Sequence, residues 1–104
     1  DALPIFQAAH RQINHQYQVD RYEVEIRQVL EGQDSNTQAN VLASLAPMET
    51  HEKIAAMEVM GAMPMSMRTR LLRQSNDLCL WDRIAMFHGW ARRHQQGVDV
   101  VQVP

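Results

Sequence analysis

The sequence predicts an all-α protein, and two patterns carry this prediction. Residues 51–63, HEKIAAMEVMGAM, are apolar almost all the way round when they form a helix, and only Glu58 interrupts the interior of the run. A helix that is hydrophobic on every side is normally buried on every side. The flanking segments show apolar residues at helical spacing between capping residues, prolines and glycines. We therefore predict a compact bundle or short stack of five to six helices around a buried central helix at about 51–63.

Length and composition are those of a single soluble domain. The chain has 104 residues, of which 45% are apolar and 21% charged, so it is long enough to form its own core. We assign residues 1–97 to one helical domain and 98–104 to an extended C-terminal tail. The valines of that tail predict an edge strand or an unstructured end. No apolar run approaches the 18 or so residues of a membrane span, and nothing resembles a signal peptide, so a cytoplasmic location is expected.

Two apolar faces follow one another in the first helical segment. Asp20 and Glu23 lie between these faces at capping-box spacing, which predicts that a second helix begins at Arg21. One continuous helix from Pro4 to Leu30 is the alternative, because no residue just before Asp20 breaks a helix. The buried face of the second half is predicted to contain Tyr22, Ile26, Val29 and Leu30.

Capping residues and prolines divide the middle of the chain. Ser35 and Gln38 again show capping-box spacing and predict a further helix. Its inward side chains are predicted to be Val41, Leu42 and Leu45. Pro47 and Pro64 bound the central helix, and Ser66 is placed to cap a short helix that follows it.

A weak internal repeat surrounds the central helix. The tetrapeptide LAPM at 45–48 is matched by AMPM at 62–65, seventeen residues later, and each ends one helix and leads into the next. This alternation of helix, proline and helix resembles the short helical stacks of flagellar-motor and magnesium-transporter regulatory domains. The resemblance covers under a third of the chain and has no diagnostic residues, so it implies no function.

The last helix is predicted over about 77–96, and it carries two apolar faces. Its main face contains Leu80, Trp81, Ile84, Phe87, His88 and Ala91. We interpret His88 there as a core histidine with its hydrogen bonds satisfied. The second face, roughly 130° round the helix, contains Cys79, Met86 and Trp90 and is flanked by Arg83 and Arg93. Trp, Met and Arg are enriched in interface cores, so these five residues are the predicted partner-binding set.

No pattern in the chain predicts catalysis, a cofactor or a metal site. The His-Glu pair at 51–52 begins like a zinc-protease motif, but Ala55 stands where the second histidine is required. Cys79 is the only cysteine, which excludes a disulfide within the chain and a multi-cysteine zinc site. We interpret the methionine-rich run at 57–67 as core packing, with a plastic partner-binding groove and a Cu(I) site as alternatives.

Charge is distributed unevenly along the chain. Residues 1–63 carry nine acidic and four basic side chains, a net charge of −5, whereas residues 64–104 carry three and six, a net charge of +3. Such an asymmetry suits an adaptor or a subunit that assembles with copies of itself. We therefore expect a non-enzymatic protein–protein interaction domain, with an adaptor, assembly or regulatory role, which binds a protein partner or self-associates.

An arginine-dependent nucleic-acid-binding domain is the alternative. Residues 51–74 would then form a helix-turn-helix with its turn at Gly61. Arg68, Arg70 and Arg73 on the second helix would contact phosphates or guanines. The overall acidic charge and the scarcity of polar residues on the first helix favour the protein-binding interpretation.

Overall fold

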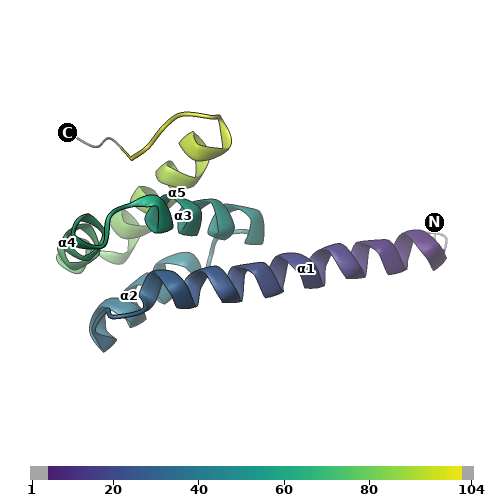
Figure 1. Ribbon diagram of the computed structural model, residues 1–104, viewed down its shortest axis with the longest axis horizontal. Coiled ribbons are helices and arrows are strands. Elements are labelled where there is room, and N and C mark those ends of the chain that lie inside the picture. Colours follow the sequence, from purple (N-terminus) through teal and green to yellow (C-terminus); the bar gives the residue numbers. More distant parts are fainter. Residues whose placement is uncertain (1–4, 102–104) are drawn as a thin grey trace.

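The chain folds as a set of helices around one buried helix. A computed structural model describes residues 5–101, with the side chains of residues 6–8 left out. The described residues form α1 (Ile5–Leu30), α2 (Ser35–Leu45), α3 (Thr50–Ala62), α4 (Met65–Ser75) and α5 (Leu80–Gln95) (Figure 1). Helix α3 packs against both α1 and α5, and α2 packs against α5 and α4. The predictions of an all-α fold and of a central helix at about 51–63 are confirmed. None of the described helices is long and apolar enough to cross a membrane.

Helix α3 forms the middle of the core because almost every side of it is apolar. Ala56, Met57 and Met60 are fully buried, and Met63 just after the helix is buried as well. Their flexible thioethers fill the space between α1 and α5. The interpretation of the methionine-rich run as core packing is confirmed for Met57, Met60 and Met63, and it is wrong for Met65, which is exposed. On α5, Phe87 and Trp90 join this core and meet edge to face, with their ring centroids 5.4 Å apart.

Helix α1 is one continuous helix, so the predicted break at Arg21 is wrong and the alternative of a single helix is confirmed from Ile5 onward. Pro4 lies outside the described residues. The carboxylate of Asp20 does not cap a helix; it accepts a hydrogen bond of 2.9 Å from Gln16 one turn earlier. Only the C-terminal half of α1 is packed on the bundle, and the N-terminal half projects beyond it (Figure 1).

The start of α2 is capped by Asp34 and not by Ser35. The Asp34 carboxylate accepts a 2.7 Å hydrogen bond from the backbone N–H of Thr37, which is the usual N-cap geometry. The Gln38 side chain donates to the backbone carbonyls of Leu30 and Gln33, so it ties α2 to the end of α1. The predicted N-cap is therefore wrong by one residue, and α2 begins at Ser35, one residue earlier than an N-cap at Ser35 implies.

The turn between α3 and α4 lies at Met63 and Pro64. The predicted end of the central helix before Pro64 is confirmed, whereas the turn at Gly61 that the helix-turn-helix alternative required is wrong, because Gly61 is inside α3. Pro64, and not Ser66, occupies the N-cap position of α4, where its extended backbone suits the change of direction. The chain thus breaks at the proline, because proline cannot continue the hydrogen-bonded ladder of the preceding helix.

Helix α5 starts at Leu80, three residues later than predicted, because residues 76–78 form turn hydrogen bonds to the end of α4. After α5, Gly97 adopts a left-handed φ of +80°, which glycine tolerates without strain, and the chain reverses there. Val100 and Val101 return to pack partly buried against the core. Residues 98–101 form no strand, and Val103 lies outside the described residues.

Candidate interaction surfaces

The five predicted partner-binding residues are divided between core and surface. Trp90 is only 9% exposed and belongs mainly to the core. Arg83 is turned toward α2, where it donates to the Asn40 carbonyl at 3.0 Å and to Ser44 Oγ at 3.2 Å. Its guanidinium therefore joins two helices. Cys79 is exposed at the N-cap of α5, Met86 is half-buried, and Arg93 is exposed.

Three of these five residues line one hollow on the outer side of α5. This hollow has a volume of about 440 Å³ and is lined by Ala85, Met86, Gly89, Trp90, Arg92, Arg93 and Gln96. Gly89 leaves it open: a Cβ at this position would have no neighbour closer than Arg93 Nη2, at 4.0 Å. Small residues on a helix allow a second backbone to approach closely, and Arg92 and Arg93 place positive charge at the rim.

Trp81 is the exposed aromatic of α5, so its predicted place on the main buried face of the helix is wrong. Its side chain is 77% exposed, beside the partly exposed Leu78 and Leu80. Trp81 is six residues from the buried Phe87, which places the two about 120° apart on the helix. The sequence spacing alone gives this angle, and the predicted main face was wrong because it included residues from too wide an arc of the helix. Trp81 and Ala85 are one turn apart, so the tryptophan adjoins the hollow.

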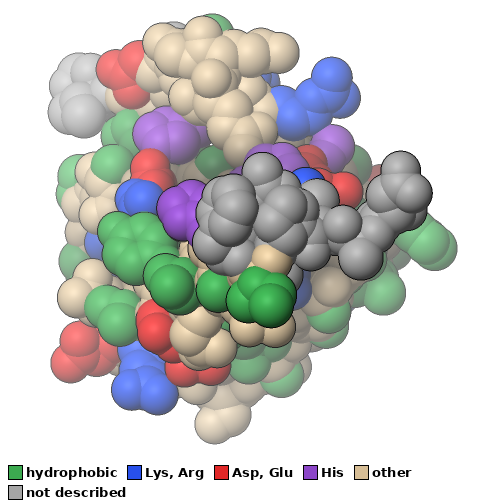
Figure 2. Space-filling view, turned by 90° about the vertical axis from the view of Figure 1, so that its right-hand side faces the viewer, with side chains coloured by type: hydrophobic (Ala, Val, Ile, Leu, Met, Phe, Trp, Pro, Cys, Tyr) green, Lys and Arg blue, Asp and Glu red, His purple; other side chains and the backbone are tan. Residues whose placement is uncertain are grey.

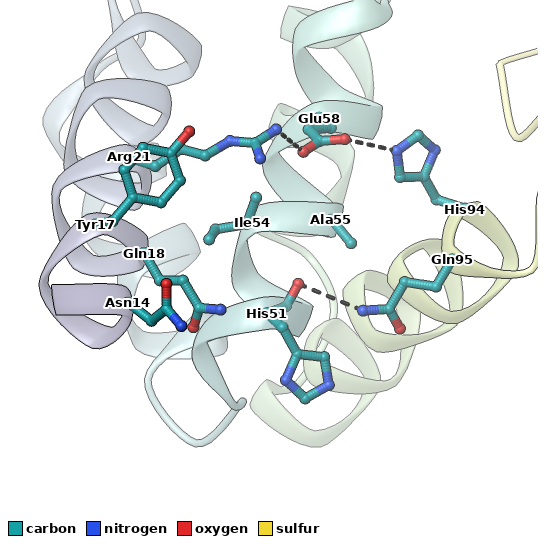
Figure 3. A pocket seen from close by; sticks show the side chains of 10 residues that line it. All are labelled: Asn14, Tyr17, Gln18, Arg21, His51, Ile54, Ala55, Glu58, His94 and Gln95. Carbon is teal, nitrogen blue, oxygen red and sulfur yellow. Dashed lines mark hydrogen bonds and ion pairs between the residues drawn. The ribbon is translucent and has the colours of Figure 1, made fainter. Parts of the chain in front are cut away.

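A cleft of about 620 Å³ lies between α1, α3 and α5 (Figure 3). Ile54 and Ala55 of α3 line it, together with Tyr17 of α1 and Gln95 of α5. Glu58 stands at one side of this cleft with both carboxylate oxygens occupied. One oxygen pairs with the guanidinium of Arg21, and the other lies 2.8 Å from His94 Nε2. The single polar residue in the interior of the central run therefore links α3 to both neighbouring helices.

A second histidine of α5 pairs with a carboxylate of α3. His88 Nε2 contacts Glu52 Oε2, and the His88 side chain is partly exposed, so its assignment to the core is wrong. Glu49 and His51 lie close to Glu52 and offer ligand atoms within 4.8 Å of one another, the spacing a metal ion needs. The paired Glu52 oxygen and the exposure of Glu49 and His51 are as expected for an ordinary surface cluster, and we assign no metal to it.

The three arginines that the nucleic-acid-binding alternative requires differ in their contacts. Arg68 donates to the carbonyls of Met60, Gly61 and Met63, at 2.9, 3.1 and 3.3 Å, and so closes the end of α3. Arg73 lies 4.0 Å from the Asp34 carboxylate, and Arg70 is exposed. The fold does not bring the three guanidinium groups together on one reading surface.

The outer side of α1 carries a further set of exposed apolar residues. Ile13 is 67% and Tyr17 65% exposed, and Ile5 and Val24 are exposed as well. Leu42 of α2, which was predicted to point inward, is 46% exposed near the C-terminal end of α1. Figure 2 looks at the projecting end of α1 and shows histidine side chains above that end and hydrophobic side chains below and beside it.

Comparison of the chain with protein-family models, with curated proteins and with solved structures finds no match.

Proposed function

We propose that this protein is a non-enzymatic protein–protein interaction domain that binds a partner along the outer side of α5. The observation that carries the proposal is the exposure of Trp81 next to the hollow at Gly89. Tryptophan is the residue most enriched in the energetic centres of protein interfaces. The exposed tryptophan, with Leu78 and Leu80 also exposed close by in the chain, leaves apolar surface in water, and a partner would remove it.

The chemistry of this surface suggests which partner segment it accepts. Ala85 and Gly89 are small, so a helix or an extended strand can lie close to α5 at this position. Trp81 offers an apolar contact at one end, and Arg92 and Arg93 offer positive charge at the other. A segment with apolar side chains followed by acidic ones complements both ends. Exposed arginines at the rim favour fast and specific association more than high affinity.

The partner is sought by affinity capture from lysate of the native host, with the wild-type chain and Trp81→Ala as paired baits. A partner that depends on Trp81 should be enriched on the first bait only. Met65→Ala is the matched control, because Met65 is also an exposed apolar residue but belongs to α4. The affinity of the purified partner is then measured in solution. Trp81→Ala and the double reversal Arg92→Glu with Arg93→Glu should each weaken it about tenfold or more.

Two experimental outcomes would contradict the proposed function. One is a partner whose affinity is the same for wild type, Trp81→Ala and the arginine reversal. The other is steep salt-dependent binding to generic duplex DNA that the reversal of Arg70 and Arg73 abolishes. The second outcome would replace the proposed function with nucleic-acid binding.

A further inference from the structure

The projecting half of α1 has no packing partner within the described part of the chain. Its buried residues, Ile26, Val29 and Leu30, all lie toward the C-terminal end of the helix. Residues 9–18 are exposed throughout. Isolated helices shorter than about 12–15 residues are only marginally stable in water, because most helical stability comes from tertiary packing. A second element that covers this half would supply the packing it lacks.

One face of α1 is suited to such packing. Ile13, Tyr17 and Val24 are spaced by four and seven residues, which places them within about 40° of one another around the helix. This face points away from the bundle-facing side that holds Ile26. Beside it lies a shallow, mostly apolar hollow of about 310 Å³, which is lined by Tyr17, Asp20, Arg21, Val24, Glu25 and Gln28.

A second hollow of about 340 Å³ lies at the C-terminal end of the same helix, where α1 meets α2. It is lined by Ile26, Arg27, Leu30, Glu31, Gln38 and Leu42. The exposed Leu42 adds apolar surface there. This second hollow lies on the bundle-facing side of α1, because Ile26 lines it. The outer band is therefore the exposed face together with the first hollow, from Ile13 to Gln28, and at 1.5 Å per residue it is about 23 Å long.

The charges of α1 indicate which element would fit this band. Residues 5–17 contain Arg11 and two histidines but no acidic residue. Residues 18–30 contain three acidic residues against Arg21 and Arg27, a net charge of −1. The two ends of α1 are therefore complementary in charge to each other. An antiparallel copy of α1 brings the basic half of one chain over the acidic half of the other.

We infer that α1 pairs with α1 of a second copy of this chain, antiparallel and through the outer band. A twofold axis near the middle of α1 places Ile13 of one copy opposite Val24 of the other, and the reverse, as an isologous interface requires. The two bundles lie on opposite outer sides of the helix pair, because each packs on the other side of its own α1.

Sedimentation equilibrium of the full chain at micromolar concentrations tests the inference. We expect a mass of twice the 12.0 kDa of the monomer for the wild type. Ile13→Asp and Val24→Asp should shift the mass to that of the monomer, because each places a charge in an apolar contact. Met65→Asp, which changes an equally exposed residue on α4, should leave the dimer intact. Circular dichroism confirms that the variants fold, which is expected because both changed side chains are exposed.

Disulfide trapping tests the orientation in a Cys79→Ser background, which removes the only cysteine. A mixture of Ile13→Cys and Val24→Cys chains should form the mixed disulfide under mild oxidation. Each variant alone should form much less disulfide-linked dimer. Disulfides need Cα atoms within about 7 Å, so a parallel pair would give the opposite pattern. A monomeric wild type, an unchanged Ile13→Asp dimer or preferential like-with-like disulfides would each overturn the inference.

The inference is independent of the proposed function. Trp81→Ala changes α5 and should leave the sedimentation mass unchanged. Ile13→Asp changes α1 and should leave the affinity of one domain for one partner molecule unchanged. Failure of either proposal is therefore visible without failure of the other.

Discussion

Single side chains close the ends of these helices and tie them together. Glu58 joins α3 to α1 through Arg21 and to α5 through His94, so one carboxylate holds three elements at the edge of the cleft. Arg68 donates to three carbonyls at the end of α3, where helix carbonyls run out of intrahelical donors, and only that of Met60 also accepts from a backbone N–H, that of Met63. The polar residues of the central region are thus structural, and their roles follow from the positions of the helix ends.

Arg68→Ala should lower the free energy of unfolding, because the three carbonyls lose a charged donor. Hydrogen bonds to charged groups contribute about 1.5–3 kcal/mol, and the loss should be of this order. Arg70→Ala is the matched control on the same helix, and its exposed side chain should change stability by less than about 0.5 kcal/mol. Urea denaturation measures both. An equal effect of the two variants would contradict the role assigned to Arg68.

The titration of Asp34 should make the stability of the fold vary with pH in the acidic range. The hydrogen bond from the Thr37 backbone lowers the pKa of the Asp34 carboxyl below its ordinary value of 3.8. A carboxyl whose pKa is lower in the folded state stabilises the fold fully above its unfolded pKa, and the contribution is lost as the pH falls through the folded pKa. Asp34→Asn keeps a capping side chain that does not titrate. The wild type should therefore lose more stability than Asp34→Asn when denaturation is repeated at pH values from neutral to below 3.8.

At the scale of elements, the sequence predicted the central helix well and the ends of the other helices less well. The apolar circumference of α3 requires burial on every side, so its position followed from the residues alone. The capping-box pattern at Asp20 is a local signal, and it was overridden because Asp20 accepts a hydrogen bond from Gln16 inside one continuous helix. Local hydrogen-bonding patterns therefore fixed helix ends only to within a few residues.

The candidate site shows the same limit. Helix α5 carries more apolar surface than its neighbours can cover, and the sequence alone did not decide which tryptophan would be covered. The packing of α5 on α3 and α2 buries Trp90 and leaves Trp81 in solvent. Met86, Trp90 and Arg93 line the hollow as well, so the predicted set was correct about the helix but missed its most exposed aromatic residue.

The packing role of the methionines in α3 leads to a prediction at this scale. Met60→Ala removes a fully buried side chain from the core and should cost about 2–5 kcal/mol of unfolding free energy. Met60→Leu nearly conserves volume and should cost less than about 1.5 kcal/mol. Thermal or urea denaturation compares the two. Similar large losses in both variants would show that the thioether itself is needed, contrary to the packing interpretation.

Substitutions at two helical glycines distinguish effects on the stability of the fold from effects on partner binding. A Cβ at Gly61 would lie 3.8 Å from Val29 Cγ2, an ordinary contact, and a Cβ at Gly89 would enter the open hollow. Gly61→Ala and Gly89→Ala should each stabilise the fold by about 0.5–1 kcal/mol, because alanine favours the helix over glycine. Only a larger residue in the hollow, Gly89→Leu, should also block the partner proposed for α5. Equal partner affinity of Gly89→Leu and Gly61→Ala would contradict the assignment of the hollow.

At the scale of the whole molecule, the two proposals together describe a bivalent binder. The long axis of the chain measures 49 Å and its shorter axes 29 and 24 Å, and α1 extends from one side of the bundle (Figure 1). Pairing through α1 would place one bundle on each outer side of the helix pair. Each bundle would then present its own α5 surface, so a dimer could engage two partner copies on one assembly.

Bivalency should appear as a difference in apparent affinity between two assay arrangements, one with the partner immobilised and one with the domain immobilised. On a surface dense with partner, the wild type binds through two domains, and the second contact is intramolecular, which raises apparent affinity by about 10²-fold or more. Ile13→Asp should lose this gain, because the monomer has one α5 surface. When the domain is sparsely immobilised and the partner is in solution, Ile13→Asp and wild type should bind equally. Surface plasmon resonance in both orientations measures the difference, and an Ile13→Asp variant that retains the full gain on the dense surface would show that binding does not depend on pairing through α1.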